Sequence, residues 1–295
     1  MVDDGSTDGT LSILKKYAAA DKRIRLIEKG HSGLTASLNI GLEHARGEWI
    51  ARLDADDIAI STRLEQQLNF VQKDEDVCLL GGGCIEVDKQ CNSTRTYLYA
   101  TDHESLINGF LRGTPSFPHS SAFFNKEAAI NIGGYNPRFP QSQDLDLWFR
   151  LSEVGKIACL ETPVVKLRKH ETAISNKLSG TQIVMGVCAC ICHFRRKANL
   201  PDPSKMDEGE WKKFVDWVEH RLRTRDHFEF VLARQILHDA WNNLNGNKNV
   251  FDLKRLSKYL LKYGANREVL STRFYEKSHL HLVEQLQKEI PFLLQ

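Results

Sequence analysis

Three carboxylates, Asp54, Asp56 and Asp57, end a short β-like run that begins at Trp49. Like charges this close repel one another, so something must offset them. Carboxylates spaced one residue apart suit Mg²⁺ or Mn²⁺ carrying a phosphate, because these ions take one or two carboxylates and fill their other positions with water and ligand oxygens. For this cluster taken alone, the alternative is a solvated acidic turn that caps the helix expected from Arg63.

A second acidic turn covers Val2 to Thr10 and leads directly into a helical pattern over Leu11 to Ala19. Asp4 fits the first position of a calcium-binding loop, but Lys15 occupies the twelfth, where a bidentate Glu is required. A calcium-binding EF-hand is therefore excluded.

Short β-like runs alternate with helical stretches through the first 175 residues. This alternation predicts an α/β fold with a mostly parallel sheet covered by helices. Ligands of such open sheets bind beyond the carboxyl ends of the strands, which is where the Asp54 cluster would lie. The β-like runs are Ile24–Ile27, Trp49–Leu53, Val77–Leu80 and Ile157–Leu160, and the helical stretches are Leu11–Ala19, Thr35–Ala45 and Arg63–Gln72.

The charge and the hydrophobic pattern both change near residue 175. The whole chain has 40 Lys+Arg and 38 Asp+Glu, and its formal charge of +2 is too balanced for a protein whose whole surface binds nucleic acid. Residues 1–175 carry a net charge of −4 and residues 176–295 one of +6. Apolar residues then recur at helical spacing, from Trp211 to Leu222 and from Ile236 to Leu244. We therefore expect two domains, 1–175 and 176–295, of which the second is small and helical.

The cysteines and the apolar runs indicate a cytoplasmic protein. The longest uncharged apolar run, Ile183 to Cys192, is far shorter than the roughly 20 residues that span a bilayer. Met1 to Asp4 has neither the basic nor the apolar region of a secretory signal, and the seven cysteines lack paired spacing, which favours reduced thiols. The spacing from Cys188 to His193 does not match a zinc site, so we expect small buried core side chains there.

Six segments of the chain form a series whose order is specific to one family, although each segment alone is weak evidence for it. Together they resemble the family 2 glycosyltransferases, which are nucleotide-sugar-dependent enzymes of the GT-A fold. The resemblance covers about residues 1–175. The segments are Val2 to Thr10, Gly33 to Gly47, Leu53 to Glu65, Gly133 to Tyr135, Gln143 to Trp148 and Leu167 to His170.

The resemblance implies a role for each matched residue. Asp4 would contact the base and ribose of the nucleotide, and Asp54 would lie near the nucleotide and the sugar. Asp56 would be the carboxylate of the DxD motif that holds a divalent metal, Mn²⁺ or Mg²⁺, on the diphosphate, and His170 would reach the metal or the diphosphate. Asp144 would be the catalytic base that takes a proton from the acceptor hydroxyl. By residue type alone, Asp144 is more simply explained as a helix cap and His170 as a surface or core residue.

The resemblance also implies the reaction and its partners. An inverting glycosyltransferase would move a sugar from a nucleotide-diphosphate sugar, with a UDP-sugar as the expected donor, to a hydroxyl of a glycan or lipid-linked acceptor in envelope or surface glycan synthesis. The basic C-terminal region suits a cytoplasmic protein that contacts the inner face of an anionic membrane, although its interspersed charges also fit a solvated helical surface. Nucleic acid is not an expected partner, and the sequence does not indicate the oligomeric state.

The chain departs from the family pattern in three places, one of which is the absence of the Arg that often precedes the Asn at position 39. Family members place an apolar strand, a loop and a helix before the turn at Asp3 and Asp4, so we expect an N-terminally truncated GT-A sheet that an upstream extension would stabilise. Gln143 stands where the family usually has Glu, which changes the electrostatic field at Asp144.

Two other classes of function stay open from the sequence. A haloacid dehalogenase-type phosphohydrolase also has D-x-D at a strand end, but Ile58 stands where that family needs Thr or Val, and its later Lys and Gly-Asp pair cannot be placed. The second is a non-catalytic, degenerate transferase that binds a nucleotide or sugar. Nucleotide release that depends on an acceptor would separate glycosyl transfer from both.

Overall fold

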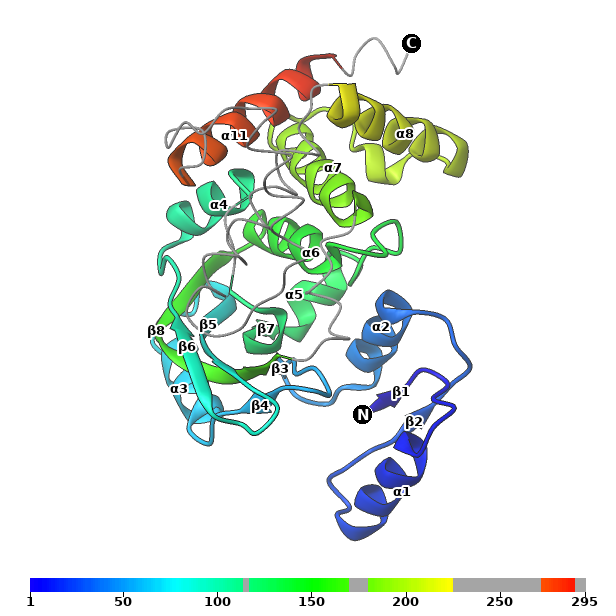
Figure 1. Ribbon diagram of the computed structural model, residues 1–295, viewed down its shortest axis with the longest axis vertical. Helices are drawn as coiled ribbons and strands as arrows, with labels where there is room; N and C mark the ends of the chain where they lie inside the picture. Colours follow the sequence, from blue (N-terminus) through cyan, green and yellow to red (C-terminus); the bar gives the residue numbers. More distant parts are fainter. Residues whose placement is uncertain (114–116, 170–179, 225–271, 290–295) are drawn as a thin grey trace, which may run out of the picture. The chain divides into compact units, whose positions relative to one another are not determined.

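The computed structural model describes residues 1–113, 117–169, 180–224 and 272–289 (Figure 1). The chain divides into two compact units, Met1–Ile107 with Ser116–His170 and Asn108–Pro115 with Glu171–Gln295. All strands of the described chain belong to the first unit, and the described part of the second unit is helical.

A six-stranded mixed sheet forms the centre of the first unit (Figure 1). Its two longest strands, β5 (Val77–Val87) and β8 (Lys156–Arg168), are parallel neighbours. On the other side of β5 lies β7 (Phe123–Asn125), which is antiparallel to β5 and also to β3 (Trp49–Ala51) at the end of the sheet. The β-like runs expected at Trp49, Val77 and Ile157 are thus strands, and β5 and β8 extend well beyond the predicted ends.

Two further strands, β4 (Ile58–Ala59) beside β8 and β6 (Ser93–Tyr97) beside β5, are antiparallel to their neighbours. The α/β class is confirmed, but the sheet is mixed and not mostly parallel. Between β5 and β6 the chain turns tightly, and the Asp88 carboxylate accepts hydrogen bonds from the main-chain N–H groups of Gln90 and Asn92. Parallel neighbours need a long crossover connection, so this short turn enforces the antiparallel pair.

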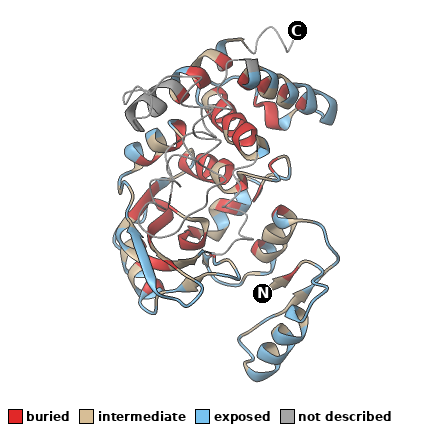
Figure 2. Cartoon of the chain, viewed as in Figure 1, coloured by how far each residue is buried: buried red, intermediate tan, exposed pale blue. Residues whose placement is uncertain are grey.

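Helices α3 (Arg63–Val71) and α6 (Gln143–Ser152) pack against β5 and β8. α6 is buried along nearly its whole length (Figure 2), and its Leu147, Trp148 and Phe149 are all 0% exposed. Full burial of a large apolar side chain contributes about 1.5–3 kcal/mol, so α6 is firmly anchored to the sheet. Two further helices are α4 (His103–Leu111) and α5 (Lys126–Asn131).

A separate two-stranded parallel sheet pairs β1 (Val2–Asp3) with β2 (Ile27–Glu28), and α1 (Thr10–Ala20) connects the two strands. α1 has no buried residue, and its Ile13 and Tyr17 are 57% and 60% exposed (Figure 2). Among the described strands, β1 pairs with β2 alone and β3 with β7 alone. Each therefore has one edge without a partner strand.

Helix α2 (Leu34–His44) is clamped to the loop that follows α5. The Asn39 side-chain amide donates to the Tyr135 carbonyl at 2.8 Å, and the Tyr135 N–H donates back to Asn39 Oδ1, also at 2.8 Å. Thr35 adds a third bond, from its hydroxyl to the Phe139 carbonyl at 3.1 Å. Two sequence segments about 100 residues apart are thereby fixed side by side.

In the second unit, α7 (Gly180–Lys197) packs against α8 (Glu208–Thr224) and α11 (Thr272–Glu289). The helical spacing predicted from Trp211 is confirmed, because Trp211 and Phe214 of α8 are buried. The second helical pattern, Ile236 to Leu244, lies outside the described residues. Of the helices that the structure describes, none is long and apolar enough to cross a bilayer.

The cysteines of α7 are core residues, as their spacing predicted. Cys188, Cys190 and Cys192 are at most 1% exposed. Burial raises the pKa of the Cys190 thiol to about 12, so it remains protonated at neutral pH. These thiols therefore pack as small apolar side chains.

The two hydrogen bonds between Asn39 and Tyr135 make the structure sensitive to a methyl group at Gly134. Gly134 has φ +66°, and a Cβ there would lie 2.7 Å from Asn39 Oδ1. We expect Gly134→Ala to lower the free energy of unfolding by about 1–3 kcal/mol, since it adds both backbone strain and a clash. Gly133→Ala is the control, because Gly133 has φ +89° but no atom within 4 Å of its Cβ position. Urea denaturation measures both variants, and equal losses would mean that contact with Asn39 contributes nothing.

Candidate functional site

The turn after β3 brings three carboxylates together. Asp54, Asp56 and Asp57 each offer an oxygen, and these oxygens all lie within 4.8 Å of one another. The Arg52 N–H bonds to the Ala122 carbonyl at 3.0 Å, which prolongs the pairing of β3 with the start of β7. The Asp57 N–H then closes the turn on the Asp54 carbonyl at 3.3 Å. The cluster predicted from the spacing of these residues is therefore formed at the carboxyl end of β3.

A buried arginine lies against this cluster. Arg52 is 8% exposed, and its guanidinium forms a two-point ion pair with the Asp54 carboxylate. It also donates to the Ser120 hydroxyl oxygen at 3.2 Å. The positive charge offsets part of the repulsion among the carboxylates. Sequence reasoning missed Arg52, because one basic residue in a β-like run makes no pattern.

Asp57, the third acid of the cluster, has hydrogen-bond partners from two other segments of the chain. Its carboxylate accepts from the Ser120 hydroxyl and, at 3.1 Å, from the Arg168 N–H. Burial raises the pKa of Asp57 above its ordinary value, and these two hydrogen bonds act in the opposite direction. Asp57 is therefore tied to the protein on two sides.

The end of β8 also reaches the cluster. Arg168, its last residue, donates from Nε to the Asp56 carbonyl at 3.1 Å, in addition to its bond to Asp57. His170 follows two residues later and lies outside the described residues. Its assignment as a metal or diphosphate contact stays a prediction.

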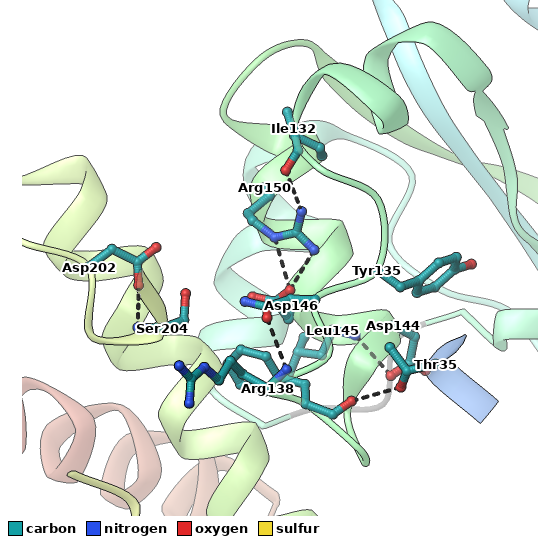
Figure 3. Close-up of polar contacts among 12 residues, drawn as sticks. Thr35, Ile132, Tyr135, Arg138, Asp144, Leu145, Asp146, Arg150, Asp202 and Ser204 are labelled. Atoms are coloured by element: carbon teal, nitrogen blue, oxygen red, sulfur yellow. Dashed lines mark hydrogen bonds and ion pairs between the residues drawn. The ribbon is translucent and has the colours of Figure 1, made fainter. Parts of the chain in front are cut away.

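Asp144 lies at the N-terminal turn of α6 (Figure 3). Ser142 occupies the N-cap position of the helix, so Asp144 is the second helical residue and not the cap. Its Oδ1 accepts the Leu145 N–H at 2.9 Å. Burial raises the pKa of Asp144, the Leu145 N–H and the Arg52 charge lower it, and the Asp54 charge raises it. Asp144 thus lies within electrostatic reach of the Arg52–Asp54 pair.

The second acid of α6 has a structural role. Asp146 is 0% exposed and forms an ion pair with Arg150, whose Nε and second guanidinium nitrogen approach the Asp146 carboxylate at 2.9 and 2.6 Å (Figure 3). Arg150 also donates to the Ile132 carbonyl at 3.0 Å. This network fixes α6 to the end of α5 and so fixes the position of Asp144.

Asp4 has a separate set of partners from the segment between β2 and α2. It forms an ion pair with Lys29 and accepts the N–H groups of Ser32 and Gly33, both at 2.9 Å. The hydrogen bond from Lys29, together with those from Ser32 and Gly33, holds the pKa of Asp4 far below its usual range. Asp4 is therefore an ionised acceptor that fixes the loop leading into α2.

His119, which sequence reasoning missed, forms a partly buried polar pair with Tyr135. His119 Nε2 lies 2.7 Å from Tyr135 Oη, and Trp148 meets the imidazole edge-on at 5.4 Å between ring centroids. Burial holds the pKa of His119 well below its ordinary value and raises that of Tyr135, so both are neutral at pH 7. Asp144 lies close enough to act on the Tyr135 pKa.

Comparison with known proteins shows similarity to glycosyltransferases. Residues 1–133 match the model of glycosyl transferase family 2. EpsE of Bacillus subtilis, described as a glycosyltransferase, is 35% identical over 182 residues, which are 60% of this chain and 64% of EpsE. The amylovoran biosynthesis glycosyltransferase AmsE of Erwinia amylovora is 29% identical over 146 residues, 49% of this chain and 54% of AmsE. The chain thus matches less than two thirds of the length of these relatives.

A solved structure is similar in fold. The crystal structure of S. aureus TarS 1-349 superposes with a TM-score of 0.50 at 13% sequence identity, and the match covers 100% of this chain and 81% of that one. The match of residues 1–133 and the named glycosyltransferases among the relatives support an assignment to glycosyl transferase family 2. This similarity does not favour the haloacid dehalogenase alternative, which shares only the D-x-D spacing.

Proposed function

We propose that this protein is an inverting glycosyltransferase that moves a sugar from a nucleotide-diphosphate sugar to an acceptor hydroxyl. The observation that carries the proposal is the position of Asp144, on an anchored helix and within electrostatic reach of the Arg52–Asp54 pair. A base within electrostatic reach of an acidic cluster that Arg52 partly neutralises suits a reaction in which one oxygen loses a proton and a diphosphate gains negative charge.

Asp144 acts as the general base in this proposal. Its carboxylate accepts the proton of the acceptor hydroxyl as that oxygen attacks the anomeric carbon from the face opposite the diphosphate. The new carbon–oxygen bond forms, the bond to the diphosphate oxygen breaks, and the nucleoside diphosphate leaves with the electron pair. The base must be ionised, and the Leu145 N–H and the Arg52 charge favour this form.

The acidic cluster fits a divalent cation by the chemistry of its donors. Three carboxylate oxygens within 4.8 Å are the hard ligands that Mg²⁺ and Mn²⁺ prefer, and Asp56 is exposed. A bound cation would stabilise the charge of the leaving diphosphate. Asp56 would be its main ligand, with His170 as a further one, and Asp54 would lie toward the nucleotide and sugar.

The proposed glycosyltransferase reaction also implies a donor and an acceptor. Asp4 would contact the nucleotide base and ribose, and the donor would be a UDP-sugar. The name of AmsE supports an acceptor in polysaccharide biosynthesis. The net charge of +6 on residues 176–295 suits a lipid-linked acceptor at the inner face of an anionic membrane.

The metal assignment is tested by Asp56→Ala. We expect the wild-type protein to bind UDP more tightly with Mn²⁺ than with EDTA, and the variant to lose this difference, because the exposed carboxylate ligand is gone. Isothermal titration calorimetry measures UDP binding with each addition. Asp76→Ala, which removes an exposed carboxylate outside the cluster, should leave Mn²⁺-dependent binding unchanged. UDP affinity of Asp56→Ala that still responds to Mn²⁺ as in the wild type would refute the assignment.

The base assignment is tested by Asp144→Asn. The amide keeps the shape of the side chain but cannot accept the proton, so transfer should fall by about 10²- to 10⁴-fold while donor binding persists. Burial raises the pKa of Asp144 above its ordinary value of 3.8, so the wild-type kcat should fall as the pH drops through that raised pKa, where the base becomes protonated. Acceptor-dependent UDP release against pH measures both effects. Equal losses of donor affinity and turnover would make Asp144 a binding residue instead.

A further inference from the structure

Ser120 links the acidic cluster to the rest of the sheet. It lies in the 3₁₀ turn His119–Ser121 just before β7 and is only 1% exposed. Its hydroxyl lies 3.0 Å from Asp54 Oδ2 and also contacts Asp57 Oδ2. Asp54 and Asp57 are more than 60 residues away in the sequence, so the fold alone creates this contact.

The direction of the Ser120 hydroxyl is fixed by its other partners. Its oxygen accepts the Asp54 N–H at 3.1 Å and the Arg52 guanidinium at 3.2 Å. A serine hydroxyl has two acceptor lone pairs and one proton. Because these two donors occupy the lone pairs, the proton must point to the carboxylates of Asp54 and Asp57, which share it.

We propose that Ser120 is a positioning residue that holds the carboxylates of Asp54 and Asp57 beside Asp56, so that the cluster of three acids can bind a divalent cation. This inference rests on the proposed function. The Ser120 proton draws two mutually repelling carboxylates toward one point, and the same oxygen binds the Arg52 side chain that neutralises Asp54. Groups that orient metal ligands in this way commonly contribute 10- to 100-fold to metal affinity.

The neighbouring serine provides a matched control. Ser121 is 0% exposed, and its hydroxyl donates to the Pro118 carbonyl at 2.8 Å and accepts the Gly82 N–H at 3.2 Å. Both partners of Ser121 are main-chain groups outside the acidic cluster. Ser120→Ala and Ser121→Ala therefore remove equally buried hydroxyls, of which only the first contacts the carboxylates.

The test is Mn²⁺ affinity, measured by water-proton relaxation enhancement without donor or acceptor. We expect Ser120→Ala to bind Mn²⁺ about 10- to 100-fold more weakly than the wild type, and Ser121→Ala to bind it within twofold of the wild type. Thermal melts of each variant report the stability of the fold separately. If Ser120→Ala does not fold, Ser120→Cys replaces it, because a thiol has a similar shape but is a weak hydrogen-bond donor.

The outcomes separate this inference from the proposed function. If the wild type binds Mn²⁺ and the folded Ser120 variant binds it equally well, Ser120 does not position the cluster, and the proposed function is unaffected. Equal weakening in Ser120→Ala and Ser121→Ala would likewise overturn the inference, because a general packing defect would explain both. If the wild type binds neither Mn²⁺ nor UDP, the metal-dependent function fails and the role of Ser120 fails with it.

Discussion

Repulsion among the carboxylates that follow β3 is the constraint on which this end of the sheet depends. Three carboxylates with oxygens within 4.8 Å cannot be held by a turn alone. Three groups stabilise the cluster: the buried arginine that directly follows β3, a serine hydroxyl from the turn before β7 and a main-chain N–H from the end of β8. They come from three segments that are far apart in the sequence, so the cluster forms only when the neighbouring strands are correctly paired.

The helices around the sheet meet a related requirement for Asp144. A carboxylate that is partly removed from water keeps its charge only if dipoles or cations surround it. α6 supplies its N-terminal N–H groups, and the Arg150 network together with the buried apolar face of the helix keeps those groups in place. The Asn39–Tyr135 clamp then ties α2, which follows the Asp4 loop, to the same region. The rigid position of Asp144 therefore comes from contacts that are not themselves part of the site.

Residues that form a local pattern could be predicted from the sequence, and residues that act through distant contacts could not. The D-x-D-D spacing after a β-like run predicted the cluster at Asp54, and helical periodicity predicted α8. Arg52 and His119 have no such pattern, since their roles come from partners such as Asp54 and Tyr135 that only the fold brings near. The mixed sheet was missed for a related reason, because alternation of strands and helices does not report the short turn between β5 and β6.

The free energy needed for local opening differs between two parts of the first unit. It is low around the exposed helix α1 and high in the core of the sheet. The segment from Val2 to Glu28 is held by the pairing of β1 with β2, which covers two residues of each strand, and it contributes few buried side chains. Strands β5 and β8 and helix α6, in contrast, lie in the core. Amide hydrogens exchange with solvent through the least expensive opening that frees them. Those of β1 and α1 should therefore exchange through local openings, and those of β5 only through global unfolding. The loop around Asp4 should therefore be weakly protected against hydrogen exchange, and the helix that begins with Gln143 should be strongly protected.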